Sequence, residues 1–177
     1  NYVPFDDLVI DVLKKSILRL TAPKKYGGQD LTVVDYVMVE EELIRTAQIW
    51  VLGELIFSTT GPGPSVLMRA DNEEVKKKFL NDVVTGTRRC AITLTEPKYG
   101  SNLNDLETSA RLEGDYWIVN GSKRFITGAV DNDLYSTFCR FNNIRGARGI
   151  GAIIIEKGTP GVTIIEGPAY VGTRGIP

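Results

Sequence analysis

The stretch Ile92-Thr93-Leu94-Thr95-Glu96-Pro97-Lys98-Tyr99-Gly100-Ser101 decides the fold class of this chain, because here a helical pattern gives way to an alternating one. If the stretch begins as a strand, Thr93 and Thr95 point to one face of a sheet. Ile92 and Leu94 then point to the opposite face. One face would belong to the core, and the other could present hydroxyl groups to a ligand.

The second half of the stretch departs from a regular strand. Pro97 lacks the amide that would continue a ladder of hydrogen bonds. Gly100-Ser101 lets backbone amides approach a ligand closely, as a pyrophosphate or an amide carbonyl requires. Taken alone, these residues favour an ordinary β-turn over a binding loop.

The residues before this stretch are predicted to be helical. From Phe5 to Leu20, apolar side chains recur at helical spacing, and a turn follows at Tyr26-Gly27-Gly28. Thr32 stands three residues before Asp35, which resembles a capping box and predicts a helix that runs to about Arg45.

Two further helices are expected before residue 88. Residues 49–57 are almost wholly apolar, which is typical of a helix enclosed by its neighbours. Gly61-Pro62-Gly63-Pro64 is predicted to break that helix. Asp71 and Glu74 are predicted to open another helix, which ends at Gly86.

After Gly86, turn signals arrive every several residues, which predicts an antiparallel β-domain. Gly114-Asp115 and Asn120-Gly121 have the composition of hairpin turns. The expected strands cover residues 92–95, 106–113, 116–120, 123–127, 134–141, 150–156 and 162–166. We therefore expect an α+β chain, with a helical bundle over residues 1–87 and an antiparallel β-barrel-like domain, incomplete at its end, over residues 88–177.

Composition excludes several classes of function. With 21 lysines and arginines against 22 acidic residues, the chain has no broad attraction for nucleic acid. Its apolar stretches are too short for membrane insertion, so we expect a cytoplasmic protein, or one of the mitochondrial matrix if the source is eukaryotic. The absence of histidine removes imidazole-based nucleophilic catalysis and histidine-ligated metals. Cys90 and Cys139 lack metal-ligand spacing, so we expect buried thiols and no metal site.

A second segment adds to the case for ligand binding. In Lys123-Arg124-Phe125-Ile126-Thr127, strand alternation would place Phe125 and Thr127 on the same face. An aromatic plane beside a hydroxyl donor suits a planar heterocycle with polar edges. An isolated Phe-x-Thr pattern is more often an ordinary strand with its phenylalanine in the core.

Three motifs in this order resemble the acyl-CoA dehydrogenase family. They are Pro23-Lys24-Lys25-Tyr26-Gly27-Gly28, then Thr95-Glu96-Pro97 with Gly100-Ser101, then Val119-Asn120-Gly121-Ser122-Lys123 with Phe125-Ile126-Thr127. The resemblance covers nearly the whole chain. It implies a helical amino-terminal domain, a middle β-domain and a carboxy-terminal helical domain that is absent from this chain.

The resemblance also implies a cofactor, a substrate and partners. These are FAD, an acyl-CoA thioester, an electron-transfer flavoprotein, and other copies of the chain in a homodimer or homotetramer. FAD would be bound by Ile92, Thr93, Leu94, Thr95, Ser101, Phe125, Ile126 and Thr127. Among these, Thr95 would donate to the polar edge of the flavin, and Ser101 would touch the acyl-CoA arm or the cofactor phosphates. The expected role is oxidation of acyl-CoA in fatty acid metabolism.

Three positions depart from the family pattern. Phe125 stands where tryptophan is common, Tyr99 replaces a small residue, and Asn102 replaces an aspartate. These changes bear on acyl-chain preference and phosphate contacts more than on flavin binding.

The resemblance places the catalytic base, a glutamate, outside this chain. Glu54 lies within an apolar run and is either structural or functional, because a buried carboxylate needs a partner or a raised pKa. Two other functions stay open at this point. One is an acyl-CoA oxidase or related flavin monooxygenase, and the other is a non-catalytic scaffold subunit that binds flavin or CoA.

Overall fold

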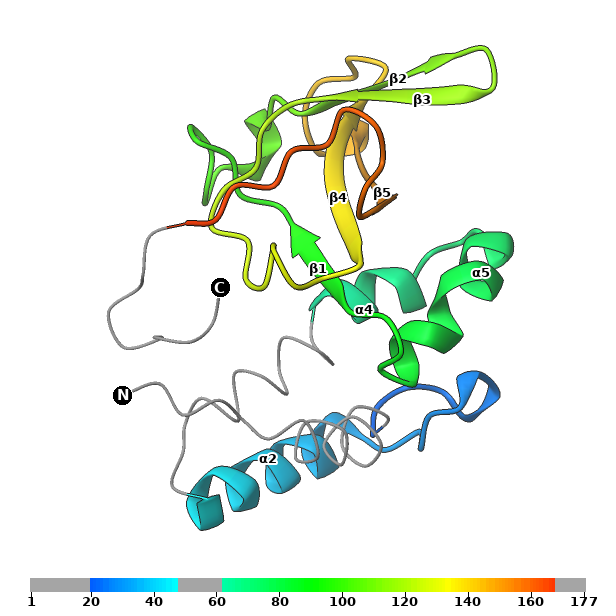
Figure 1. Cartoon of the computed structure of the whole chain (residues 1–177), viewed down its shortest axis with the longest axis vertical. Coiled ribbons are helices and arrows are strands. Elements are labelled where there is room, and N and C mark those ends of the chain that lie inside the picture. The colour runs from blue at the N-terminus through cyan, green and yellow to red at the C-terminus, as the bar shows by residue number, and fades with distance from the viewer. Residues whose placement is uncertain (1–19, 48–61, 168–177) are drawn as a thin grey trace.

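The computed structural model describes residues 20–47 and 62–167 (Figure 1). The helices predicted over residues 5–20 and 49–57, together with Glu54, lie outside these ranges, apart from Leu20. Within them the chain is a mixture of helices and a five-stranded sheet, as the α+β prediction requires. Short 3-10 turns η1 (Lys24–Tyr26), η2 (Leu103–Asp105) and η3 (Ala147–Gly149) connect the longer elements.

The first described helix, α2 (Val33–Ala47), begins at the predicted capping box. The Thr32 amide donates to Asp35 Oδ2 at 2.9 Å, and the Asp35 amide donates to Thr32 Oγ1 at 3.2 Å. These two bonds satisfy amides that the first turn of a helix leaves without partners. The helix ends two residues beyond the predicted Arg45.

Helices α4 (Pro62–Met68) and α5 (Glu73–Val84) correct two sequence predictions. Pro62 opens a helix that the sequence did not predict, because proline lacks just the amide that a first helical position does not use. The N-cap of α5 is Asn72, not Asp71, since its side chain accepts hydrogen bonds from the amides of Glu74 and Val75. Gly86 follows the end of α5 with φ +72°, as expected for a helix stop.

The sheet contains β1 (Cys90–Thr93), β2 (Ser109–Glu113), β3 (Tyr116–Asn120), β4 (Leu134–Phe141) and β5 (Ile150–Glu156). Its order is β1-β4-β2-β3, with β5 on β4. The β2–β3 hairpin and the β4–β5 pair are antiparallel as predicted. However, β1 and β2 both pair with β4 in parallel, so the sheet is mixed. Alternation in a sequence fixes the faces of a strand and not the direction of its neighbour.

Two predicted strands do not form. Residues 123–127 are a loop and turn in which Phe125 has φ +57°, a left-handed conformation that ends strand alternation. The Arg124 amide donates to the Thr95 carbonyl instead of to a ladder. Residues 162–166 are irregular as well, and the Val162 amide closes a turn onto Thr159.

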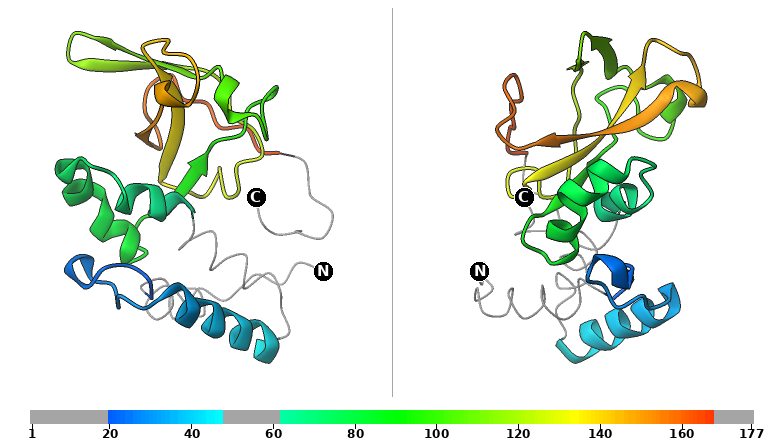
Figure 2. Two further views of the ribbon diagram at one scale, coloured as in Figure 1. Left: turned by 180° about the vertical axis from the view of Figure 1, so that it is seen from behind. Right: turned by 90° about the vertical axis from the view of Figure 1, so that its right-hand side faces the viewer.

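Helices and sheet share one hydrophobic core. Leu67 of α4 and Leu80 of α5 are fully buried against Cys90 and Leu134, the first residues of β1 and β4. Figure 2 shows the two helices at this end of the sheet from two further directions. Cys90 and Cys139 are free, buried thiols, as predicted. Because Cys90 is packed in this core, the start of β1 is fixed against the two helices. The position at which the chain leaves the sheet, after Thr93, is fixed with it.

Candidate cofactor site

A cavity of about 1300 Å³ lies beside the sheet. Its walls come from β3, the inner parts of β4 and β5, the loop that follows β3, and residues 159–167. Trp117, Phe125 and Ile126 supply apolar surface, and Thr93, Thr108 and Thr137 also line the cavity. A large, mostly apolar hollow with a few polar groups is the usual form of a cofactor site.

The cavity brings together only part of the predicted site. Thr93, Phe125 and Ile126 line it. Of the described residues that were predicted to bind the cofactor, Ile92, Leu94, Thr95, Ser101 and Thr127 are not part of its wall. The two predicted segments are nevertheless neighbours, because the Arg124 amide donates to the Thr95 carbonyl at 2.9 Å.

Thr93 does not present its hydroxyl as the sequence suggested. Thr93 is buried, and its Oγ1 donates to Thr137 Oγ1 on β4 at 2.8 Å. That bond links two strands of the sheet and uses the donor that a ligand would need. The expectation that Thr93 and Thr95 offer hydroxyls side by side is therefore wrong for Thr93.

Phe125 is exposed rather than buried. The residue is 57% exposed, and the Arg124 guanidinium lies 4.2 Å from the ring centroid. The left-handed φ of Phe125 is uncommon for an aromatic residue and is a form of backbone strain that is often found at binding sites. The alternative placement of Phe125 in the hydrophobic core is excluded.

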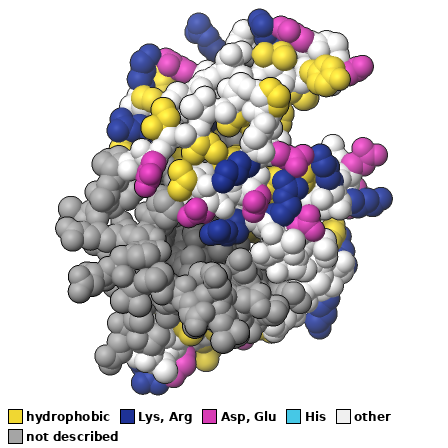
Figure 3. Space-filling view, in the orientation of Figure 1, with side chains coloured by type: hydrophobic (Ala, Val, Ile, Leu, Met, Phe, Trp, Pro, Cys, Tyr) yellow, Lys and Arg dark blue, Asp and Glu magenta, His cyan; other side chains and the backbone are white. Residues whose placement is uncertain are grey.

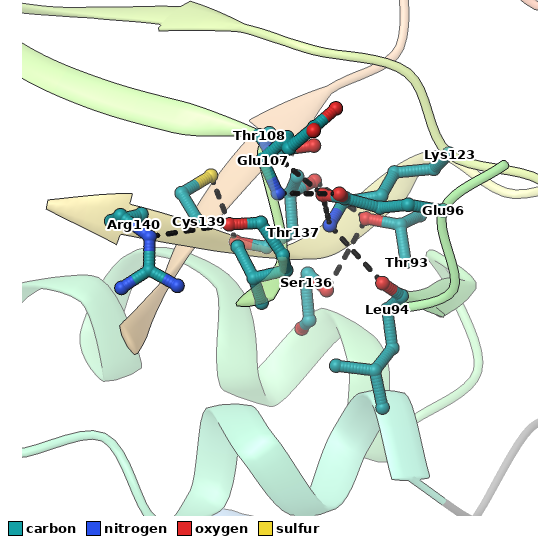
Figure 4. A network of polar contacts seen from close by, with 11 residues as sticks. Thr93, Leu94, Glu96, Glu107, Thr108, Lys123, Ser136, Thr137, Cys139 and Arg140 are labelled. Carbon is teal, nitrogen blue, oxygen red and sulfur yellow. Dashed lines mark hydrogen bonds and ion pairs between the residues drawn. The ribbon is translucent and has the colours of Figure 1, made fainter. Parts of the chain in front are cut away.

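A buried ion pair between Glu96 and Lys123 was missed by sequence reasoning. Lys123 Nζ lies 2.8 Å from Glu96 Oε1, and the two side chains are only 10% and 4% exposed (Figure 4). The amides of Glu107 and Thr108 donate to the same carboxylate at 2.6 and 2.8 Å. Both residues belong to motifs that carry the family resemblance, Glu96 to Thr95-Glu96-Pro97 and Lys123 to the motif that ends at residue 123. Their opposite charges could have indicated that the two motifs pair.

Glu96 is ionised at every ordinary pH. Burial raises the pKa of this carboxyl group, but hydrogen bonds from the Lys123 and Thr108 side chains and from the two backbone amides outweigh burial and lower the pKa to about 2. A carboxylate this acidic and this well paired is a poor acceptor for a carbon-bound proton. Its role at the site is structural rather than that of a base.

Acid is therefore expected to destabilise the protein through Glu96. Because the pKa of an ordinary glutamate is 4.5 and that of Glu96 is about 2, the stabilisation is full above pH 4.5 and is lost as the pH falls to 2. The difference corresponds to roughly 3 kcal/mol of unfolding free energy. Urea unfolding from pH 7 to pH 2 should show that the variant Glu96→Gln loses this dependence.

The control for this measurement is Glu42→Gln, which removes an exposed carboxylate that pairs with Arg45 on α2. It is expected to change the pH profile little, because exposed pairs are screened by solvent. An identical acid profile for Glu96→Gln and the unchanged protein would contradict the prediction.

Thr108 is buried at the cavity wall beside Glu96, and its side chain helps to lower the pKa of that carboxyl group. Gly121 leaves room for Thr108 Oγ1, since a Cβ at Gly121 would lie 2.3 Å away. The aromatic surface of Trp117 and Phe125 at the cavity suits a flat heterocycle such as a flavin.

The described surface carries charges of both signs. Figure 3 shows lysine, arginine, aspartate and glutamate side chains interspersed on one face, with exposed apolar side chains at the outer end of the sheet. In residues 20–47 and 62–167, no helix is long and apolar enough to cross a membrane. Across the same ranges, no three histidine, cysteine, aspartate or glutamate side chains are grouped as metal ligands would be.

Comparison with known proteins gives consistent matches along the chain. Residues 2–87 match the model of the acyl-CoA dehydrogenase N-terminal domain, and residues 91–177 match that of the acyl-CoA dehydrogenase middle domain. An acyl-CoA dehydrogenase of Bacillus subtilis is 33% identical over 97% of this chain and 45% of its own length. The caffeyl-CoA reductase-Etf complex subunit CarC of Acetobacterium woodii is 30% identical over the same shares.

Among solved structures, the FAD complex of PigA has a TM-score of 0.86 to this chain. It is 26% identical, and the match covers 93% of this chain and 43% of the PigA chain. The chain thus spans less than half the length of the relatives that it matches.

Proposed function

This chain belongs to the acyl-CoA dehydrogenase family, and we propose that its complete gene product is an FAD-dependent acyl-CoA dehydrogenase. The reaction removes a proton from the α-carbon and a hydride from the β-carbon of an acyl-CoA thioester, which leaves a trans-2-enoyl-CoA. The observation that carries the proposal is the cavity, where Phe125 and Ile126 meet the end of β1. FAD, when bound, accepts the hydride.

The residues of this chain would hold and orient the flavin. We propose that residues 92–95 run along one side of the ring and residues 125–127 cover another, with Thr95 and Thr127 as donors to its polar edge. Ser101 would contact the acyl-CoA arm or the cofactor phosphates. The bond between the Arg124 amide and the Thr95 carbonyl supports this pairing of segments. We also propose that the boundary between the helical domain and the β domain lies between residues 87 and 88.

Partners and location follow from the same proposal. We propose that electrons pass to an electron-transfer flavoprotein, as the resemblance to an Etf-complex subunit supports. We also propose a homodimer or homotetramer that acts in fatty acid metabolism in the cytoplasm, or in the mitochondrial matrix of a eukaryote. Two other functions are distinguished from this proposal by what happens to the electrons. An oxidase or monooxygenase of the family would consume oxygen when substrate reduces the flavin. A scaffold subunit would bind flavin or CoA without turnover.

The complete gene product is expected to carry FAD. Purified protein should be yellow, and chromatography of the cofactor that is released on denaturation should identify FAD. Addition of acyl-CoA thioesters of graded chain length should bleach the flavin without oxygen uptake. A folded, colourless protein that takes up no added FAD would contradict the assignment, and bleaching coupled to oxygen consumption would favour the oxidase.

A further inference from the structure

The ion pair between Glu96 and Lys123 lies between the two segments proposed to hold the flavin. Glu96 directly follows residues 92–95, and Lys123 stands two residues before Phe125. Lys123 is itself part of the cavity wall, whereas Glu96 does not line it. Glu96 accepts the amide of Thr108, which also lines the cavity, so both members of the pair are bonded to or part of the cavity wall (Figure 4).

Each partner also holds backbone groups directly. The Lys123 ammonium donates to the Leu94 carbonyl at 3.1 Å as well as to Glu96. The two oxygens of Glu96 accept the amides of Glu107 and Thr108. Through these bonds, one ion pair joins three separate loops: the one after β1, the one before β2 and the one after β3.

Stability alone does not account for such an arrangement. Two buried charges lose their hydration, and well-packed apolar side chains of similar volume often stabilise a fold as well or better. Charge-assisted hydrogen bonds differ from apolar contacts because they fix direction as well as distance. Four such bonds converge on one pair here, which specifies the relative positions of the loops at the cavity.

We propose that Glu96 and Lys123 are positioning residues for the cofactor, which set the loops on either side of the flavin without contacting its reacting atoms. This inference rests on the proposed function. It predicts that neutralising either partner weakens FAD binding, even though the two changes alter the local charge in opposite directions. A purely electrostatic influence on the flavin would instead act with opposite signs.

The test uses the complete gene product with Glu96→Gln, Lys123→Met and the double variant. Both single variants should bind FAD on the order of ten- to a hundredfold more weakly, as is typical when a supporting contact behind a bound group is removed. The flavin absorption bands should also shift. The double variant should lose less than the sum of the two single changes, because the partners act as a unit.

Glu156→Gln is the matched control. The Glu156 side chain pairs with Lys78 and Arg88 and joins α5 and the residues before β1 to β5, and none of these residues belongs to the three loops at issue. This variant should lower the unfolding temperature and leave FAD affinity and the flavin spectrum unchanged. It separates loss of stability from loss of positioning.

Two results would overturn the inference. If both single variants keep FAD affinity and flavin spectrum within twofold of the unchanged protein while their unfolding temperatures fall, the pair is only structural. If their effects on FAD affinity have opposite signs, the charges act through their field and not through position. Should Glu96→Gln fail to fold, Lys123→Met alone decides whether the pair positions the cofactor or is only structural. An unchanged protein that binds no FAD would instead refute the proposed function itself.

Discussion

Replacement of Glu96 by alanine is expected to lower the free energy of unfolding by about 3–5 kcal/mol. The change strands the Lys123 ammonium, whose side chain is only 10% exposed, and removes the acceptor for the amides of Glu107 and Thr108. Buried donors without acceptors lose their hydration and gain nothing in return. Urea unfolding of the complete gene product at pH 7 would measure the loss.

Two comparisons make this prediction specific to the buried pair. Glu107→Gln removes a partner of the exposed Lys98 and is expected to change the unfolding free energy by less than about 1 kcal/mol. The double variant Glu96→Leu/Lys123→Met removes both charges and should be more stable than Glu96→Ala. If Glu96→Ala is no worse than Glu107→Gln, the ion pair does not stabilise the fold as its burial implies.

The second large effect concerns catalysis. Residues 1–177 alone, with FAD supplied, are expected to give no measurable turnover of acyl-CoA thioesters. Abstraction of the α-proton needs a carboxylate within hydrogen-bond reach of the substrate carbon, and positioning of that base supplies much of the acceleration. Glu96 is unsuitable because Lys123 and two amides hold its pKa at about 2. Glu96 therefore does not replace the base that the family resemblance places outside this chain.

Stopped-flow mixing of residues 1–177 with FAD and a panel of acyl-CoA thioesters tests this expectation, with the complete gene product as the comparison. Absence of flavin bleaching in the short chain and bleaching in the complete protein is the expected result. Bleaching at comparable rates would place the base within these residues. The cavity carboxylates Asp131 and Glu166 would then be the first to replace, followed by Glu54.

The amino-acid sequence predicted the elements whose signals are local. The capping box at Thr32 and Asp35, the stop at Gly86 and the hairpin around Gly114-Asp115 all formed as expected. Such features depend on hydrogen bonds and backbone angles within a few residues, so neighbouring side chains suffice to specify them. The family likewise followed from motifs in their order along the chain.

The sequence failed where the partner of a segment lies far along the chain. Residues 123–127 alternate like a strand, but the amide that would begin a ladder bonds to the Thr95 carbonyl, and Phe125 adopts a left-handed conformation. Thr93 looked available for a ligand until β4 placed Thr137 within 2.8 Å of its hydroxyl. In both cases the competing partner is supplied by another element of the fold.

The sequence by itself determined that the chain is α+β, the bounds of β3, β4 and β5, and which family the chain belongs to, because these depend on local spacing and motif order. Only the tertiary structure decided the parallel pairing of β1 and β2 with β4 and the ion pair between Glu96 and Lys123. These contacts join segments that are distant in the sequence, so they depend on which segments pack together in the folded chain. A carboxylate and an ammonium 27 residues apart become a single unit only after folding removes both from water.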